Sequence, residues 1–130
     1  MSIFLIIILT VLFGVSKSIC DTSECCFKNS KLSKFNPNFW DKHKSWVNKW
    51  KNNDPINGEK FIGSSTVFVW VTDAWHIFNM LSYLSIFLIG IIISDITDNI
   101  YYITIPYLMC FVIFELSYRF LNKKKTNKKL

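Results

Sequence analysis

Hydrophobic residues fall in three blocks along the chain, and polar residues fill the spaces between them. The blocks lie near residues 3–16, 66–94 and 100–121. A lysine-rich polar stretch separates the first block from the second, and a run of lysines follows the third. A membrane-spanning helix needs roughly 20 apolar residues, because the hydrocarbon layer is ~30 Å thick and a helix rises ~1.5 Å per residue. The pattern therefore predicts an all-α membrane protein.

The second and third blocks are expected to form an antiparallel transmembrane helical hairpin over residues 66–121. Residues 100–121 have the length of one span, and the second block is densest in apolar residues over 75–94. The short polar stretch 95–99 remains between them as the turn. Backbone groups in hydrocarbon must be hydrogen-bonded within their own segment, so both blocks are predicted to be helical.

The first block leaves two interpretations open: an N-terminal transmembrane helix over residues 1–19, or a cleaved signal peptide. Its apolar run, residues 3–15, has the length of a signal-peptide core. No lysine or arginine precedes that run, however, and Lys17 follows it. Positive residues tend to stay on the cytoplasmic side of a membrane. A retained helix places residues 20–65 and the C-terminal tail in the cytoplasm and the acidic 95–99 turn outside. We therefore expect an uncleaved helix and a multi-pass protein of the cell membrane.

The formal net charge of +6 does not indicate a nucleic-acid partner. Much of the positive charge lies in the basic tail, residues 122–130, directly after a hydrophobic block. Positive charge in that position is accounted for by membrane orientation. The four cysteines form no paired C-x-x-C motif, which weakens a zinc interpretation. They would be reduced in the cytoplasm, whereas the exported alternative would favour a disulfide among the first three. The cysteines are Cys20, Cys25, Cys26 and Cys110.

Within the polar, aromatic and basic segment 20–65, the spacing predicts an interfacial amphipathic helix near residues 37–52. The Asn-Pro pair at residues 36–37 is a typical helix start. Aromatic and apolar residues then recur every three or four positions, which puts them on one helix face. Tryptophans with flanking lysines suit a helix lying on a bilayer; packing of the same side chains on the hairpin is a compatible alternative. Ser64 or Ser65 is expected to cap the second span. The stripe consists of Phe39, Trp40, His43, Trp46, Val47 and Trp50.

Polar residues of the two hairpin helices are predicted to meet at one depth. The spacing places Asp73, His76 and Asn79 on one face of the second span, and Glu115 and Arg119 on one face of the third. In a directly paired hairpin centred near residue 97, His76 falls opposite Tyr118 and Asn79 falls opposite Glu115. An unpaired ionisable residue costs ~2.5–3.5 kcal/mol at mid-bilayer, so these residues are expected to pair.

Three interpretations of this intramembrane cluster remain open, and no catalytic residue or cofactor is assigned. The first is a structural clamp in which Glu115 bridges Arg119 one turn later. The second is a metal site, for which Asp73, His76 and Glu115 are weak candidates; a single histidine makes a zinc site unconvincing. The third is proton handling by His76 with a carboxylate partner.

One part of the chain resembles a group of small bacterial and phage-encoded multi-pass membrane proteins with no established function. The resemblance covers about a third of the chain, within residues 36–80. It implies an N-terminal hydrophobic segment followed by a helical one, and it points to the tryptophan segment and the start of the second span as one unit. The matching elements are Asn36–Trp40, Ser45–Asn52, Asp54–Pro55, Gly58–Phe61, Gly63–Thr66 and Thr72–His76.

The chain is therefore expected to be a structural or interaction protein at the membrane. Its expected partners are the lipid bilayer and either a membrane protein or a second copy of itself. One alternative is a small membrane enzyme or a metal or proton site using Asp73, His76 and Glu115. The other is a phage-type protein that permeabilises membranes, which the size and basic tail fit.

Overall fold

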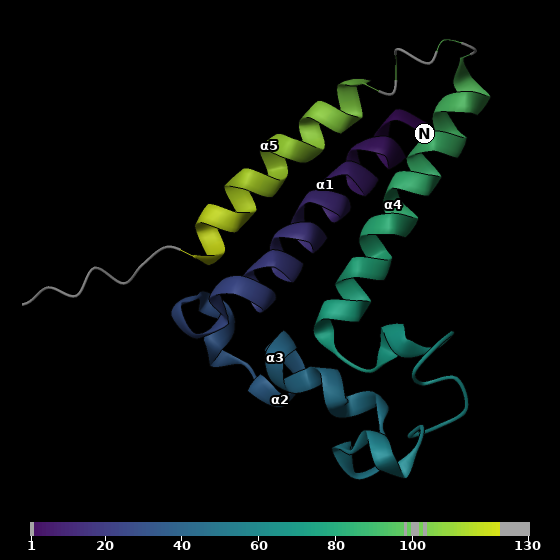
Figure 1. Cartoon of the computed structure of the whole chain (residues 1–130). Coiled ribbons are helices and arrows are strands. Elements are labelled where there is room, and N and C mark those ends of the chain that lie inside the picture. Colours follow the sequence, from purple (N-terminus) through teal and green to yellow (C-terminus); the bar gives the residue numbers. More distant parts are fainter. Residues whose placement is uncertain (1, 98, 100–101, 103, 123–130) are drawn as a thin grey trace, which may run out of the picture.

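The computed structural model describes residues 2–97, 99, 102 and 104–122 as an assembly of helices. Three long helices dominate it: α1 (Ser2–Asp21), α4 (Ala74–Ile96) and α5 (Thr104–Leu121). Between α1 and α4 lies a compact region of short helical turns, here called the cap, residues 22–73 (Figure 1). Asp98 of the expected turn, the start of the expected third span and the lysines of the basic tail lie outside the described residues.

The three long helices have the length and apolar character needed to cross a membrane. At ~1.5 Å per residue they measure roughly 27–35 Å, which matches a hydrocarbon layer of ~30 Å. The first candidate span continues past α1 to Asn29, because a π-helical turn, Thr22–Cys26, and a 3-10 turn, Phe27–Asn29, extend it. The expectation of an all-helical protein with three candidate spans is confirmed.

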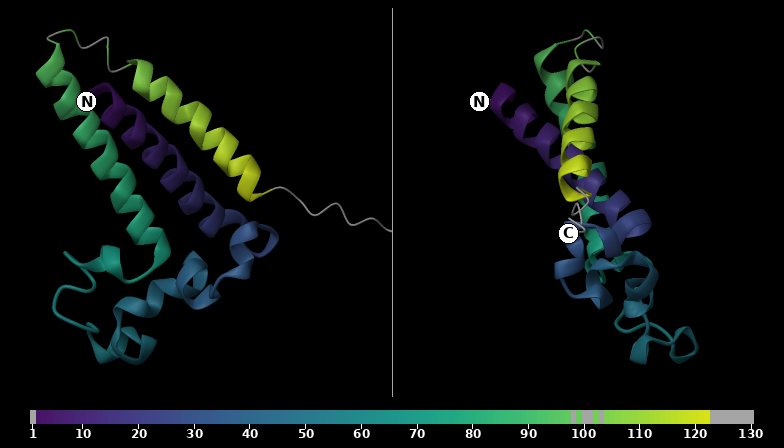
Figure 2. Two further views of the ribbon diagram at one scale, coloured as in Figure 1. Left: turned by 180° about the vertical axis from the view of Figure 1, so that it is seen from behind. Right: turned by 90° about the vertical axis from the view of Figure 1, so that its left-hand side faces the viewer.

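The first helix lies between the other two, so the expected hairpin does not pack as a pair. Figures 1 and 2 show α4 and α5 running antiparallel on either side of α1. On the α4 side, Leu9 packs with Ile89 and Ile93 in the buried core. On the α5 side, Gly14 lies so close that an added Cβ would stand 2.7 Å from Ile113 Cγ2.

Small side chains explain why α1 can occupy this central position. Without a hydrophobic driving force in lipid, helices associate where small residues let their backbones approach closely. The helix contacts are rich in such residues, all of them buried: Thr10, Gly14, Ser16 and Ser18 on α1, and Ser82 and Ser85 on α4. Most of these hydroxyls donate to carbonyls of their own helix; Thr10, for example, bonds Ile6 O at 2.7 Å.

The expected interfacial helix near residues 37–52 is broken into short pieces. Asn36 caps α2 (Pro37–Trp40), accepting a hydrogen bond from Asn38 N at 2.9 Å. Asp41 then adopts an extended backbone and caps a second short helix, α3 (Lys42–Ser45), and a 3-10 turn follows. The predicted single stripe was wrong because Asp41 restarts the helix and rotates everything after it. Trp40 packs against Phe78 of α4, with ring centroids 5.8 Å apart, whereas Trp46 is exposed.

Lysines attach the cap to the ends of the long helices. Lys42 pairs with Glu24 at 2.8 Å, and its Nζ lies 3.9 Å from the ring of Trp75 at the start of α4. Lys31 Nζ lies 3.1 Å from the ring of Phe120 near the end of α5. These cation–π contacts are each worth about 0.5–2 kcal/mol. The cap is therefore connected to both outer helices.

Candidate functional site

The clearest polar site lies where the cap meets the first turn of α4. Asp73 is only 1% exposed and precedes the first residue of that helix. Its Oδ1 accepts the backbone N–H of His76 at 2.9 Å, which is the geometry of an N-cap. The second span was expected to begin near residue 66 with a serine cap, and that was wrong. Ser64 Oγ instead donates to Lys49 O at 2.7 Å within the cap.

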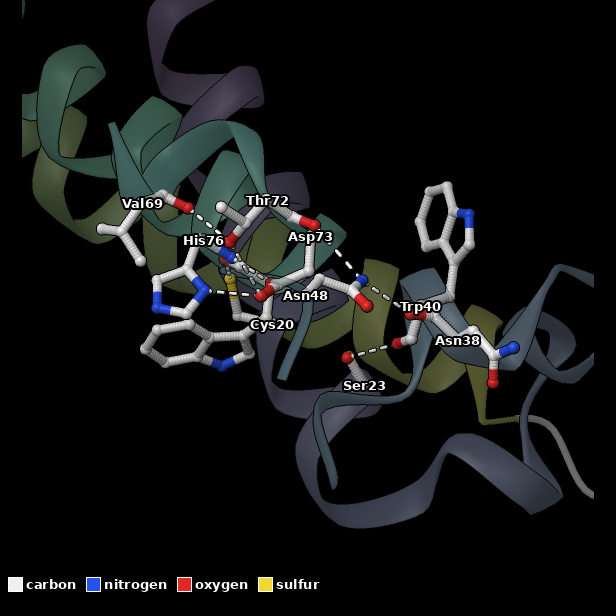
Figure 3. A network of polar contacts seen from close by, with 10 residues as sticks. Cys20, Ser23, Asn38, Trp40, Asn48, Val69, Thr72, Asp73 and His76 are labelled. Atoms are coloured by element: carbon white, nitrogen blue, oxygen red, sulfur yellow. Dashed lines mark hydrogen bonds and ion pairs between the residues drawn. The ribbon is translucent and has the colours of Figure 1, made fainter. Parts of the chain in front are cut away.

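The second carboxylate oxygen of Asp73 orients the imidazole of His76. Asp73 Oδ2 lies 2.7 Å from His76 Nδ1, and Thr72 Oγ1 approaches the same oxygen at 3.4 Å. The neighbouring Trp75 ring stands edge-on to the imidazole, with centroids 5.0 Å apart. A carboxylate bonded to one ring nitrogen fixes the tautomer and presents the other nitrogen as an acceptor. Figure 3 shows Nε2 directed away from Asp73.

Residues from three separate segments hold this corner together. Asn48 Nδ2 donates to Asn38 O at 2.8 Å and to Thr72 O at 3.3 Å, which joins the cap to the segment before α4 (Figure 3). Cys20, at the end of α1, donates through its thiol to Trp75 O at 3.4 Å. The Asp73–His76 pair therefore sits at the junction of α1, α4 and the cap.

The remaining members of the predicted intramembrane cluster lie elsewhere. Glu115 pairs with Arg119 at 2.6 Å on the outer side of α5, and the arginine side chain is 76% exposed. Asn79 contributes its backbone carbonyl to Ser82. Because α1 lies between α4 and α5, His76 does not face Tyr118 and Asn79 does not face Glu115. Within the described part of the chain, no group of three or more His, Cys, Asp or Glu side chains is arranged to hold a metal ion.

Sequence reasoning missed the residues that surround Tyr118. Its hydroxyl lies 3.2 Å from Cys25 Sγ and 3.6 Å from Cys26 Sγ, both at the end of the first candidate span. Two adjacent cysteines are visible in the sequence, but their partner is not, because it depends on α5 packing against α1. The Asp73 cap had a visible signal, since aspartate is among the preferred N-cap residues.

A further feature is the apolar segment 61–71, which precedes α4. Several of its large side chains are exposed; Ile62 is 92% exposed and Val67 is 72% exposed. Glu59 folds this segment by accepting hydrogen bonds from Gly63 N, Ser65 N and the Ser65 hydroxyl. Those bonds, led by the one from the Ser65 hydroxyl, lower the pKa of the Glu59 carboxyl below its usual value. The segment lies beside the first turns of α4 (Figures 1 and 2).

The fold defines a class of protein rather than a family. Three apolar helices, with α1 between α4 and α5, are compatible with a multi-pass membrane protein. Comparison with protein-family models, with curated proteins and with solved structures gives no match.

Proposed function

We propose that the chain is a non-enzymatic interaction protein of the membrane. Its three long helices form the anchor, and the cap lies against the headgroups of one membrane surface. There the cap binds anionic lipid and offers a docking surface to a membrane partner. The localisation that follows is the cell membrane, with α1 retained as a span.

The exposed apolar segment 61–71 is the observation that carries this proposal. Soluble surfaces rarely expose contiguous apolar patches, and such patches mark protein or membrane contacts. This one leads into α4 and reaches the level of its first turn, where the edge of the hydrocarbon layer would be (Figure 2). Aromatic side chains such as Phe68 and Trp70 suit that interfacial depth.

The distribution of lysines in the cap supports an anionic surface as the partner. Three lysines are half-buried and lie over aromatic rings: Lys31, Lys42 and Lys49. The other lysines of the cap are exposed: Lys28, Lys34, Lys44, Lys51 and Lys60. Each lysine near an anionic bilayer contributes about 1 kcal/mol of attraction.

The position of the C-terminal end supports a cytoplasmic cap. Asn122 Nδ2 donates to Thr22 Oγ1 at 2.9 Å, so the chain leaves α5 at the same end of the bundle as the cap. The lysine-rich tail begins at the next residue. The end of α5 and the lysine-rich cap therefore lie on one side of the anchor, which the positive-inside rule assigns to the cytoplasm.

Hydrogen exchange of the full chain in lipid nanodiscs tests the proposal. We expect the amides of residues 61–71 to exchange more slowly in nanodiscs containing phosphatidylglycerol than in phosphatidylcholine alone. Ile62→Ser should remove much of that protection. Ile56→Ser is a matched control, because Ile56 is also 92% exposed and lies in a separate 3-10 turn, Pro55–Asn57, outside segment 61–71. Equal exchange in both lipids, unaltered by Ile62→Ser, would refute anionic-lipid binding. Dye release from liposomes at low protein content would favour a permeabilising protein instead.

The Asp73–His76 pair supports a second candidate, a proton acceptor at the membrane surface. Its basis is the 2.7 Å contact that leaves Nε2 as the outward nitrogen. Proteoliposomes loaded with a pH-sensitive dye would reveal proton movement that His76→Gln abolishes. Glu115→Gln is the control, because that carboxylate pairs with Arg119 on the other side of α1 and should have no effect.

A further inference from the structure

The four cysteines fall into two classes that differ in environment. Cys20 and Cys110 are buried, and their thiols point at backbone carbonyls, Trp75 O at 3.4 Å and Thr10 O at 3.9 Å. Cys25 is exposed and Cys26 is half-buried; all four thiols are free. Reactivity of a thiol requires access, so the adjacent pair is the one positioned to react.

The side chains of the adjacent pair converge on a single point with a tyrosine from α5. Cys25 Sγ and Cys26 Sγ lie 2.6 Å apart, and the Tyr118 hydroxyl contacts both. The Tyr118 ring is itself held by stacking on Phe114, with centroids 5.7 Å apart. An open pocket of about 220 Å³, lined by Asp21, Glu24, Cys25, Phe114 and Tyr118, gives a small molecule a path to Cys25.

We propose that Cys25 and Cys26 form a reversible dithiol–disulfide site that reacts with small disulfides. The Cys25 thiolate attacks one sulfur of the incoming disulfide, forming a mixed disulfide and releasing one thiolate. The Cys26 thiolate then attacks Cys25 Sγ, closes the Cys25–Cys26 disulfide and releases the second thiolate. The two cysteines lose two electrons and two protons, and the incoming disulfide is reduced to two thiols.

Chain geometry makes the product easy to reduce again. Ordinary disulfides join residues whose Cα atoms are about 4.4–6.8 Å apart, and strain outside that range makes the bond more reducible. Adjacent residues have Cα atoms only about 3.8 Å apart. The 2.6 Å between the two sulfur atoms suits a metal ion less well than a disulfide. In a tetrahedral site, Zn–S bonds of about 2.3 Å hold two sulfur atoms roughly 3.8 Å from each other.

Mass spectrometry of the reduced full chain in nanodiscs tests the proposal. Iodoacetamide should label Cys25 and Cys26 and leave Cys20 and Cys110 unlabelled without denaturant. After treatment with glutathione disulfide, the number of thiols that iodoacetamide can label should fall by two per chain. The mass of the chain should fall by that of two hydrogen atoms, and no glutathionyl group should remain attached. Dithiothreitol should restore both thiols.

Two variants distinguish this chemistry from simple thiol capping. Cys26→Ser removes the resolving thiol, so one glutathionyl group should stay on Cys25. The Cys25→Ser variant should react with glutathione disulfide more slowly than the unmodified chain, because the remaining thiol, that of Cys26, is half-buried. Glutathionyl groups retained on both cysteines of the unmodified chain would overturn the proposal. So would a disulfide between two chains, or protection from iodoacetamide by added zinc without any loss of hydrogen.

Discussion

Asp73 binds His76 twice: Oδ1 accepts the backbone N–H and Oδ2 lies 2.7 Å from Nδ1 of the ring. One buried carboxylate therefore begins the long helix α4 and orients the imidazole of its first turn. The two contacts can be separated by mutation, since the first needs only an oxygen and the second depends on charge.

Asp73→Ala should lower the stability of the protein by about 0.5–2 kcal/mol, the usual cost of losing an N-cap. Asp73→Asn should cost less, because asparagine caps helices as well as aspartate does. Thermal unfolding in detergent, followed by circular dichroism of the helices, measures both. Equal losses for the two variants would show that the charge on Asp73 matters more than the cap.

The two histidines should carry their neutral-state proton on opposite nitrogens. His76 Nδ1 faces the Asp73 carboxylate and so should hold the proton, leaving Nε2 bare. His43 Nε2 lies 2.8 Å from Glu24 O, a carbonyl that can only accept, so that ring should hold its proton on Nε2. Nitrogen NMR at a pH where both rings are neutral distinguishes the tautomers. Identical tautomers at the two sites would contradict the geometry of one of them.

Gly14→Ala should destabilise the bundle by about 1–3 kcal/mol through overpacking. The added methyl group would stand 2.9 Å from Phe114 N, a backbone atom that cannot rotate away. Gly90→Ala is the matched control, because nothing lies within 4 Å of a Cβ at that position of α4. The control should gain up to about 1 kcal/mol from helix propensity. If both variants unfold at the same temperature, α5 does not pack closely on α1.

Lys42→Ala should loosen the cap, whereas Lys44→Ala should not. Lys42 pairs with Glu24 inside the cap and lies over the Trp75 ring of α4, whereas Lys44 is exposed. The expected loss is about 1–2 kcal/mol, chiefly from the cation–π contact, because a partly exposed ion pair contributes less than about 1 kcal/mol. Limited proteolysis should cut the cap of the Lys42 variant several times faster. Unchanged cleavage would mean that the other contacts hold the cap without this lysine.

Acid should release the loop that Glu59 closes. Because folding lowers the pKa of this carboxyl, its stabilising contribution is complete above the ordinary glutamate pKa of roughly 4.3. The contribution is then lost as the pH falls through the lower pKa of the folded state. Glu59→Gln should abolish this part of the acid response, which tryptophan fluorescence of the neighbouring segment can follow. A variant with the same acid transition as the unmodified chain would exclude Glu59 as its origin.

Local signals in the sequence predicted the helices better than they predicted which helices pack together. Hydrophobic block length was enough to predict three long helices, and the i, i+4 spacing predicted the contact between Glu115 and Arg119. Hydropathy does not say which apolar helix packs on which, so the central position of α1 was not predictable from it. That position depends on where small residues such as Gly14 allow close approach.

The errors within the cap have a different cause. Periodicity of aromatic residues predicted one helix over 37–52, but Asp41 competes by capping a new helix start. The backbone of the cap therefore changes direction at Asp41, although the periodicity of aromatic residues continues past it. The candidate site was predicted only in its local part, Asp73 with His76, because these residues are three apart on one chain segment.

Helix α1 lies between α4 and α5, and it is synthesised before either of the helices that cover it. Of the three long helices that the structure describes, α1 is made before the other two; α4 covers one of its flanks and α5 covers the other. Until α5 has been translated, the small and hydroxyl-bearing surface of α1 lacks its second neighbour. A chain released early, without α5, would thus display that half-covered helix to proteases that degrade incompletely assembled proteins.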